Sequence, residues 1–257
     1  MREDKTLMSY LVDGERLFMP SLSVDCVIFG FHEGQLRALL LRANGMKYWS
    51  LPGGFVAKKE SVDEAAARIL RQRTGLDQIF LHQFRLFGDP DRSDPAIHRG
   101  RAKKNRMTLK PDHWLLQRFV TVGYYALVEY SFVHAIPDDL SDACEWHDVN
   151  DLPTLMMDHE HILRSALEVL RQHLNYMPVG SNLLPERFTM PELQKLYESI
   201  LGKQLDRRNF QRRMISFGIL RRLKEKRKGL PYRAPYEYMF DKKKYDRALV
   251  DGLFGGW

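Results

Sequence analysis

The sequence has few cysteines and no long apolar run. Its two cysteines, Cys26 and Cys144, have no C-x-x-C spacing and fall in strand-like segments, so we expect buried free thiols rather than a disulfide or a metal site. No segment approaches the roughly 20 apolar residues that a membrane helix needs. Residues 1–5 are mostly charged and lack the apolar core of a signal peptide. These absences predict a cytoplasmic protein without membrane contact.

The motifs of the common covalent and phosphate-handling enzymes are also missing. There is no Gly-x-Ser-x-Gly, no P-loop and no zinc-finger spacing. His159 and His161 are two residues apart and cannot share one helix face, so residues 158–161 indicate the start of a surface helix, although His159 could line a pocket. We therefore predict no catalytic nucleophile, no bound metal and no cofactor.

The charge of the chain is unevenly distributed. The 257 residues are enough for two domains, and 44% hydrophobic residues are enough for two cores. Residues 181–257 hold 18 Lys or Arg and 9 Asp or Glu, a balance of +9, which leaves −2 for the rest of the chain. This asymmetry favours a polyanionic partner for the basic part, although a solvated basic surface would give the same count.

Proline and glycine mark the boundary between the two parts. Pro178, Gly180 and Pro185 interrupt two amphipathic stretches. We predict an N-terminal extension at residues 1–14, a first domain at 15–176, a linker at 177–186 and a second domain at 187–257. The first domain should be of the α/β (mixed α+β) class, because strand-like runs alternate with two helical patterns. Those elements are a hairpin at 21–31 and 36–42, a helix from Ser61 to Gly75, strands at 81–87 and 118–130, and a helix from about 158.

Residues 89–112 do not fit this pattern. They have no period, contain three prolines and carry the basic residues Arg99, Arg101, Lys103, Lys104 and Arg106. Long segments of this kind in compact domains are usually functional or disordered. We expect a mobile surface insertion, which we prefer slightly to an arm that contacts nucleic acid.

Residues 54–76 resemble the Nudix box, G-x5-E-x7-R-E-U-x-E-E-x-G-U, in which U is aliphatic. The matching positions are Gly54, Glu60, Arg68, Leu70, Gly75 and Leu76. The resemblance implies a Nudix-type mixed sheet between helices. Nudix hydrolases use divalent cations bound by glutamates of this helix, and such cations need oxygen ligands. Here those positions hold Ile69, Gln72 and Arg73, so we predict that the metal site is lost and that the domain is not an enzyme.

The basic part has the pattern of a winged helix-turn-helix. Thr189 with Glu192, and then Asp206, can cap two successive helices that end at Gly202 and Gly218. Strand-like runs at 219–223 and 236–240 flank a basic tip, which would be the wing. Side chains of the second helix can reach base edges, and those of the wing can contact phosphates. The expected DNA-binding residues are Arg207, Arg208, Gln211, Arg212, Lys226, Arg227 and Lys228.

A degenerate Nudix domain followed by a winged helix resembles the Nudix-related transcriptional regulators of bacteria. The resemblance implies a homodimer that binds palindromic double-stranded DNA and responds to a small-molecule effector: a sugar, a sugar phosphate or an ADP-ribose-like compound. The expected effector-binding residues are Arg42, Trp49, Glu60, Arg68 and His159. Core packing for Trp49, and an internal ion pair between Arg68 and Glu60, are equally good interpretations.

Two other classes of function stay open at this point. A metal-dependent Nudix hydrolase of ADP-ribose or a nucleotide sugar would need a relocated metal site, with carboxylates such as Glu64 or Glu129. An RNA-binding or protein-interaction module would keep the basic domain without a preference for palindromic DNA. The sequence does not identify the effector, the operator, the regulated pathway or whether the protein activates or represses.

Overall fold

The structure is a computed structural model that describes residues 13–76, 80–104, 107–133, 135, 137, 141–226 and 235–253. Most of the expected N-terminal extension therefore lies outside the described residues, as do Arg227 and Lys228 of the expected wing tip. Within the described ranges, no helix combines the length and the apolar character that crossing a membrane requires.

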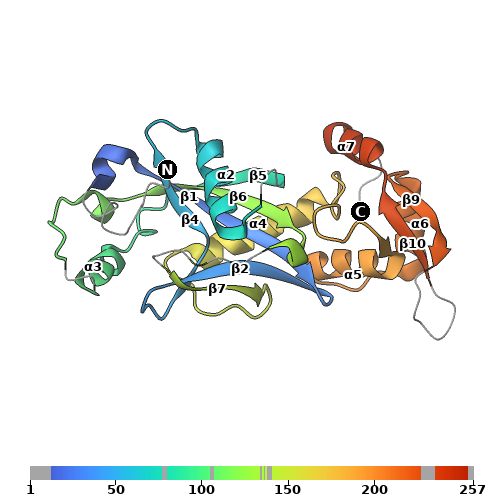
Figure 1. Ribbon diagram of the computed structural model, residues 1–257, viewed down its shortest axis with the longest axis horizontal. Helices are drawn as coiled ribbons and strands as arrows, with labels where there is room; N and C mark the ends of the chain where they lie inside the picture. The colour runs from blue at the N-terminus through green and yellow to red at the C-terminus, as the bar shows by residue number, and fades with distance from the viewer. Residues whose placement is uncertain are drawn as a thin grey trace. The chain divides into compact units, whose positions relative to one another are not determined.

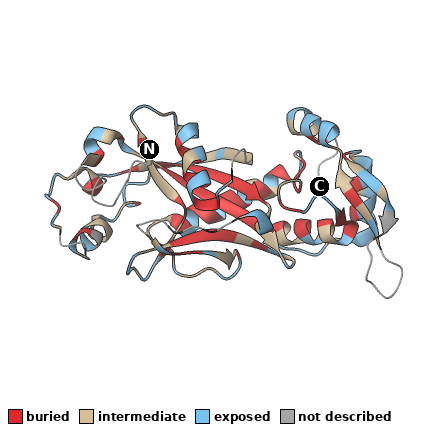
Figure 2. Ribbon diagram, in the orientation of Figure 1, coloured by how far each residue is buried: buried red, intermediate tan, exposed pale blue. Residues whose placement is uncertain are grey.

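A seven-stranded sheet occupies the first part of the chain (Figure 1). Its strands are β1 (Phe18–His32), β2 (Gln35–Ala43), β3 (Trp49–Ser50), β4 (Gly53–Ala57), β5 (Phe80–Phe87), β6 (Val120–Val128) and β7 (Ser141–Asp148). Five strands follow the order β3-β2-β1-β6-β5, while β4 pairs with β1 and β7 pairs with β2. The expected hairpin is the pair β1 and β2, which turns at Gly34 with a φ of 78°. The centre of the sheet is the most buried part of the fold (Figure 2).

Helix α2 (Val62–Thr74) is the helix of the Nudix box and begins and ends where the sequence predicts. The Ser61 side chain accepts from the Glu64 N–H while the Glu64 carboxylate accepts from the Ser61 N–H, which completes the capping box. Gly75 ends the helix at a φ of 73°, a left-handed conformation that suits glycine. Because these caps fix where α2 begins and ends, they also determine which of its residues face the sheet.

Helix α4 (His159–His173) confirms the second predicted helix. Its apolar stripe is fully buried, with Ile162, Leu163 and Leu170 at no measurable exposure. Both cysteines are buried free thiols, as expected from their sequence context. Burial and the neighbouring Asp25 carboxylate raise the pKa of the Cys26 thiol far above its usual range, so it stays protonated and unreactive.

The insertion at residues 89–112 is more ordered than the sequence suggests. It contains helix α3 (Pro95–Lys104) and is followed by a short 3₁₀ helix, η1 (Trp114–Leu116). Ala102, Leu109, Leu115 and Leu116 form a small buried cluster, against which Phe55 of β4 and Trp114 pack. The expectation of a segment without regular structure is therefore wrong, because this cluster supplies the apolar contacts that hold the insertion on the sheet.

The C-terminal part is a winged helix-turn-helix. It consists of β8 (Phe188–Thr189), α5 (Met190–Leu201), α6 (Arg207–Ser216), β9 (Leu220–Lys226), β10 (Tyr236–Phe240) and α7 (Lys242–Asp251). The three strands form a sheet in the order β8-β10-β9, with both pairs antiparallel. The sequence predicted both helices of the motif with their caps at Thr189 and Asp206, and it missed β8 and α7.

The chain divides into two compact units whose limits differ from the linear order. One unit is made of residues up to 28, 38–126 and 133–166, and the other of residues 29–37, 127–132 and 167 onwards. The second unit thus takes in the turn of the β1–β2 hairpin and the C-terminal part of α4 as well as the winged helix. The limits at 176 and 187 predicted from the sequence divide the chain into continuous segments. The two units instead group residues by their contacts in space, so each contains several separate segments.

Candidate functional site

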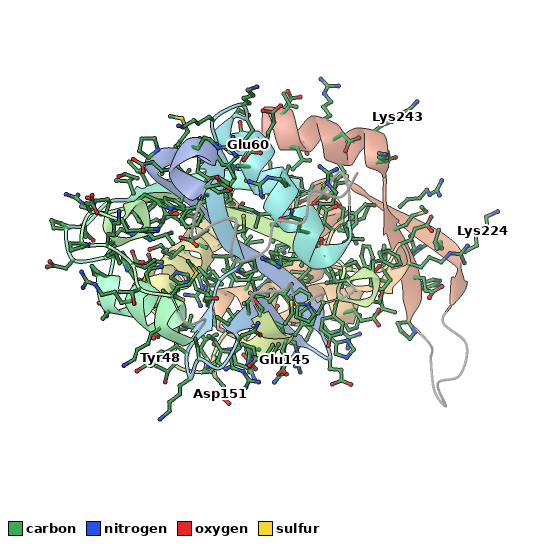
Figure 3. The ribbon with its side chains drawn as sticks, turned by 60° about the vertical axis from the view of Figure 1, so that its left-hand side comes forward. Tyr48, Glu60, Glu145, Asp151, Lys224 and Lys243 are labelled. Carbon is green, nitrogen blue, oxygen red and sulfur yellow. The ribbon has the colours of Figure 1, made fainter. Side chains whose placement is uncertain are left out.

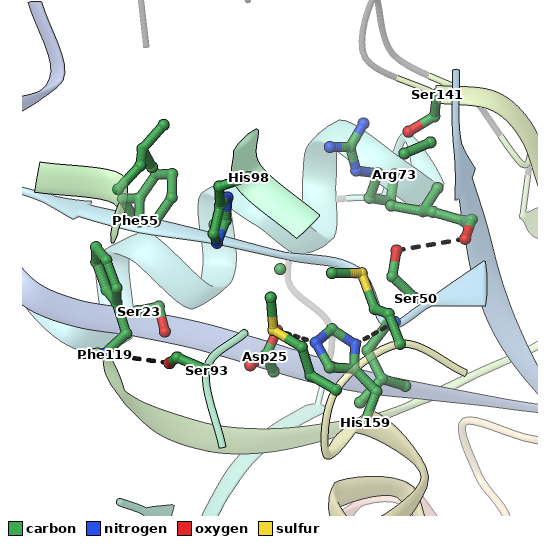
Figure 4. Close-up of a pocket in the computed structure, with 18 of the residues that line it drawn as sticks. Ser23, Asp25, Ser50, Phe55, Arg73, Ser93, His98, Phe119, Ser141 and His159 are labelled. Atoms are coloured by element: carbon green, nitrogen blue, oxygen red, sulfur yellow. Dashed lines mark hydrogen bonds and ion pairs between the residues drawn. The ribbon is translucent and has the colours of Figure 1, made fainter. Parts of the chain in front are cut away.

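A cavity of about 220 Å³ lies beside the Nudix helix (Figure 4). Its wall is built by β1, by the ends of β2 and β3, by β4 with the turn before it, by the last two turns of α2, by the insertion and by the start of α4 with the residues before it. Gly53 lets the wall approach β1 closely, because a Cβ atom there would lie 2.3 Å from an Asp25 carboxylate oxygen. Residues of the Nudix box thus form part of the cavity wall.

The charged groups of the wall favour an anion. Arg68, Arg73 and Arg92 line the cavity, whereas Asp25 is the one carboxylate among its described lining residues. Arginine stays charged at all physiological pH values. Serine hydroxyls and the rings of Phe55 and Phe119 complete the wall. Such a mixture of cations, hydroxyls and aromatic faces suits a phosphorylated ligand that also carries a ring.

Arg92 is the centre of a buried charge network in this wall. Its side chain is 4% exposed and donates to both carboxylate oxygens of Asp158, at 2.9 and 3.1 Å. It also donates to the Phe119 carbonyl at 3.1 Å, and Asp25 lies 3.6 Å away. The guanidinium therefore ties the insertion to β1 and to the residue that precedes α4.

His159 lies on the floor of the cavity, as its sequence position allowed. Its Nδ1 accepts a hydrogen bond of 2.9 Å from the Leu51 N–H, so the proton of the neutral ring is on Nε2. Nε2 lies 4.0 Å from the nearer Asp25 oxygen. Figure 4 shows the His159 imidazole facing Asp25. The ring is thus held in one orientation before any ligand arrives.

Arg68 and Glu60 form the internal ion pair that the sequence left open. Their side chains meet at 2.6 Å, and Arg68 also donates to the Phe55 carbonyl at 3.0 Å. Glu60 accepts in addition from the Ala57 N–H. Arg68 lines the cavity, whereas Glu60 is not a lining residue. Through its hydrogen bond with Ala57, Glu60 fixes the loop that leads into α2.

Arg42 and Trp49 lie together and are not among the lining residues, although their neighbours Leu41, Ala43 and Ser50 are. The Arg42 guanidinium is 5.3 Å from the centre of the Trp49 ring and donates to Asp142 at 2.8 Å. That hydrogen bond, with the Gly45 N–H, lowers the pKa of the Asp142 carboxyl. Trp49 is buried and meets the His147 ring edge-on at 4.4 Å. In this arrangement the two side chains hold β2, β3 and β7 together.

The metal-binding positions of the Nudix helix do not provide a site for a divalent cation. Gln72 and Arg73 line the cavity, while Ile69 is buried beneath Gly54, where a Cβ atom would come within 3.3 Å of it. The alternative ligand Glu64 is engaged in the capping box, and hydrogen bonds from the Ser61 N–H and the Ser61 side chain to its carboxylate lower its pKa. Among the described residues, no group of three or more His, Cys, Asp or Glu could hold a metal ion. The donor set therefore does not fit Mg²⁺.

The second helix of the winged domain presents an exposed basic surface. Phe210 and Met214 of α6 are buried, which turns the opposite face of the helix outward. Four expected DNA-binding residues lie on that outer face: Arg207, Arg208, Gln211 and Arg212. Arg212 donates to Asn209 at 3.0 Å, which holds its guanidinium over the first turns of the helix. Polar side chains near the start of such a helix can reach base edges.

Further basic residues next to this helix were missed in the sequence analysis. Arg221, Arg222 and Lys224 lie exposed on β9, and Lys226, which the sequence analysis had named, is the last residue of that strand. Lys224, like Lys243 of α7, points away from the ribbon (Figure 3). The alternation of residues along β9 could have indicated Arg222 and Lys224, since every second side chain of a strand shares a face. Asp25 gave a weaker signal, as a lone charge within an apolar strand.

The fold and the sites define a Nudix-type domain joined to a winged-helix DNA-binding domain. Sequence models support both parts: the NUDIX domain matches residues 19–166, and the NrtR DNA-binding winged helix domain matches residues 180–240. One similar protein is the ADPR responsive transcriptional repressor NtrR of Acinetobacter baylyi. It is 31% identical over 208 residues, which are 78% of this chain and 74% of the relative. The chain therefore belongs to the family of Nudix-related transcriptional regulators.

Two further proteins resemble the chain. The crystal structure of Shewanella oneidensis NrtR complexed with a 27mer DNA has a TM-score of 0.70 and 27% identity, and covers 92% of this chain and 99% of that one. An ADP-ribose pyrophosphatase of Methanocaldococcus jannaschii is 29% identical over 156 residues, 59% of this chain and 76% of the relative. Regulators thus match over both parts of the chain, whereas the enzyme matches over a smaller share of it.

Proposed function

We propose that this protein is an ADP-ribose-responsive transcriptional repressor that binds a two-fold symmetric operator as a homodimer. One observation carries the proposal: the chain joins an exposed basic recognition helix to a Nudix cavity whose metal-binding positions hold Ile69, Gln72 and Arg73. The name of the similar Acinetobacter protein supports both the effector and the repressing role. A repressor of bacterial operators acts in the cytoplasm.

In this proposal the winged domain reads DNA through α6. Arg208, Gln211 and Arg212 contact base edges in the major groove, and Arg207 with the wing residues Lys226, Arg227 and Lys228 contacts phosphates. Arginine pairs with guanine through two parallel hydrogen bonds, whereas glutamine pairs with adenine in the same way. Two copies of the helix would then occupy successive turns of one face of the duplex.

The cavity is the proposed effector site, with Arg68 and His159 in its wall. Its arginines suit the diphosphate of ADP-ribose, and Phe55 and Phe119, whose ring centres lie 5.3 Å apart, offer aromatic faces for the adenine. Arg42, Trp49 and Glu60 contribute to the site indirectly, because they hold the segments that form its wall. ADP-ribose changes operator affinity only to the extent that it binds the DNA-bound and free forms differently.

We further propose that the protein does not hydrolyse its effector. Hydrolysis in Nudix enzymes depends on divalent cations that carboxylates hold beside the diphosphate. The cavity wall offers Asp25 alone among its described carboxylates, and that group already faces Arg92 and His159. Binding without turnover is what a reversible sensor requires.

The test is a selection of duplex fragments from the source genome by the purified protein at near-physiological salt, with and without ADP-ribose. Excess nonspecific DNA is present because phosphate contacts alone give affinity that falls steeply with salt. We expect a two-fold symmetric site that is recovered without ADP-ribose and lost with it. The same protein, incubated with ADP-ribose and Mg²⁺, should release no AMP. Failure to enrich any site in either condition, or metal-dependent turnover, would argue for the enzyme instead.

A further inference from the structure

The insertion at residues 89–112 forms one wall of the cavity. It contributes Arg92, Ser93 and His98 to the lining. Leu115 and Phe119, which follow the insertion in the chain, line the cavity as well. A ligand that occupies the cavity therefore meets the insertion, although no residue of the insertion belongs to the Nudix box.

Hydrogen bonds hold the start of the insertion in place. Arg92 donates to the Phe119 carbonyl at 3.1 Å, and the Ser93 hydroxyl accepts from the Phe119 N–H at 3.3 Å. The Asp94 carboxylate then accepts from the Ala96 N–H at 2.8 Å, which is the hydrogen bond of a helix cap. These contacts fix the point at which helix α3 begins.

Apolar packing determines which face of α3 is turned toward the domain. Ala102 is 1% exposed and belongs to the small buried cluster that holds the insertion on the sheet. His98 lies four residues before Ala102 and therefore on the same face of the helix. Arg99 and Lys103 follow these two residues and are exposed. Helix α3 thus directs His98 toward the cavity and the neighbouring basic residues toward solvent.

His98 reaches the cavity on its aromatic side. Figure 4 shows His98 on the same side as Phe55 and Phe119, whereas Ser50 and Arg73 lie on the other side. His98 is half-buried and lines the cavity, so part of its side chain faces the space that a ligand would fill. Flat rings, including that of histidine, are the surfaces on which proteins stack a nucleic-acid base.

We propose that the adenine of the effector stacks on the imidazole of His98, so that the insertion selects an effector that carries a base. Stacking uses the face of the ring, and every base offers such a face. This inference rests on the proposed function for the identity of the effector. It adds a source of specificity: a sugar phosphate without a base gains nothing from this wall of the cavity.

The test is calorimetric titration of the full chain with ADP-ribose and with ribose 5-phosphate, which has a sugar and a phosphate but no base. We expect His98→Ala to bind ADP-ribose about 5- to 150-fold more weakly, as for the loss of a stacking side chain. Its affinity for ribose 5-phosphate should stay within about twofold of the wild type. His98→Phe keeps a flat ring and should bind ADP-ribose within about fivefold of the wild type.

Arg99→Ala is the matched control. Arg99 is the next residue of α3, exposed and outside the cavity lining, so this variant shortens a side chain of the same helix without changing the wall. Its affinity for both ligands should stay within about twofold of the wild type.

A second comparison covers the case in which His98→Ala does not fold or ribose 5-phosphate binds too weakly to titrate. His98→Leu keeps much of the side-chain volume without a flat ring. It should bind ADP-ribose at least about fivefold more weakly than His98→Phe, because only the phenyl ring can stack on the base.

Three results would overturn the inference, and they can be told apart. ADP-ribose binding that His98→Ala leaves unchanged, or that is equal in His98→Leu and His98→Phe, contradicts the stacking role while the regulator proposal stands. Equal weakening of both ligands by His98→Ala would mean that His98 shapes the cavity without contacting the base. Absence of ADP-ribose binding by the wild type removes the proposed effector, and the inference with it.

Discussion

At the scale of single residues, the cavity depends on charges that are buried in pairs. Arg92 and Asp158 lie in segments far apart in the sequence, and neither belongs to the Nudix box. A buried ion pair contributes little net stability, but loss of one partner leaves an uncompensated charge in the protein interior. Arg92 is therefore a sensitive point of the fold.

The first prediction concerns this residue. Arg92→Ala should lower the free energy of unfolding by about 3–5 kcal/mol, because the carboxylates of Asp25 and Asp158 stay buried without their cation. Urea denaturation of the full chain measures the change. The control is Arg16→Ala, which breaks the exposed ion pair with Asp13 and should cost less than about 1 kcal/mol. Equal losses of unfolding free energy in the two variants would show that the charge of Arg92 does not stabilise the fold.

Some of the cavity could be predicted from residues and some could not. The spacing of the Nudix box identified Arg68 and Arg73, and the position of His159 just before an apolar helix suggested a pocket residue; all three line the cavity. Arg92 was missed because its burial depends on Asp158 and Phe119, contacts that no local pattern encodes. Whether Arg42, Trp49, Glu60, Arg68 and His159 affect effector binding stays a prediction.

At the scale of elements, the helix ends were predictable because capping is local. The boxes at Ser61 and Thr189 and the cap at Asp206 are formed as the sequence indicates. The two-residue strands β3 and β8 were not predictable, since each exists only by pairing with β2 or β10. Helix α3 was missed because its apolar contacts come from a cluster shared with Phe55 rather than from a periodic face.

The turn between α5 and α6 carries the second prediction. The Glu198 carboxylate accepts from the Leu205 N–H at 2.9 Å and from Gln194 at 3.0 Å, and these bonds lower its pKa. A lowered pKa stabilises the fold above the ordinary carboxyl pKa, and that contribution is lost as the pH falls through the lowered value.

The corresponding variant is Glu198→Gln, which keeps an acceptor oxygen but loses the charge. At neutral pH it should be less stable than the wild type by up to about 1 kcal/mol, and the difference should shrink as the pH falls below the ordinary carboxyl range. Urea unfolding at a series of pH values measures it. A difference that is independent of pH would contradict the role of the charge.

The third prediction tests α6 as the recognition helix. Arg212→Ala should weaken operator binding by about 1–3 kcal/mol and leave the thermal transition unchanged, because the side chain is exposed. Fluorescence anisotropy with labelled operator measures the affinity. Lys195→Ala, an exposed substitution on α5, is the control and should bind normally. Normal binding by Arg212→Ala would remove that residue from the interface.

At the scale of the whole molecule, the uneven charge has a consequence for binding at different salt concentrations. The basic balance of +9 lies in residues 181–257, and each phosphate that a protein contacts adds about −0.9 to the slope of log affinity against log salt. Operator binding should therefore weaken steeply with salt, while ADP-ribose binding beside partly buried charges in the cavity should change less.

The fourth prediction follows from that slope. Lys224→Ala, on the exposed face of β9, should reduce the magnitude of the slope for operator binding by about 1, which is the loss of one phosphate contact. Lys59→Ala removes an equally exposed charge from the Nudix part and should leave the slope unchanged. The measurement is operator affinity at several potassium chloride concentrations. Identical slopes for the wild type and Lys224→Ala would exclude β9 from the DNA contact.

Helix α7 begins at Lys242, two residues after the end of the matched winged-helix domain, and it makes contacts with the segment before that domain. The Tyr245 hydroxyl donates to the Pro178 carbonyl at 2.8 Å, and its ring meets Phe240 edge-on at 4.9 Å. The Leu253 N–H bonds to the Tyr176 carbonyl at 2.7 Å. A recombinant fragment limited to residues 180–240 would lose these contacts with the segment before β8, so a fragment meant to keep them has to include residues 176–253.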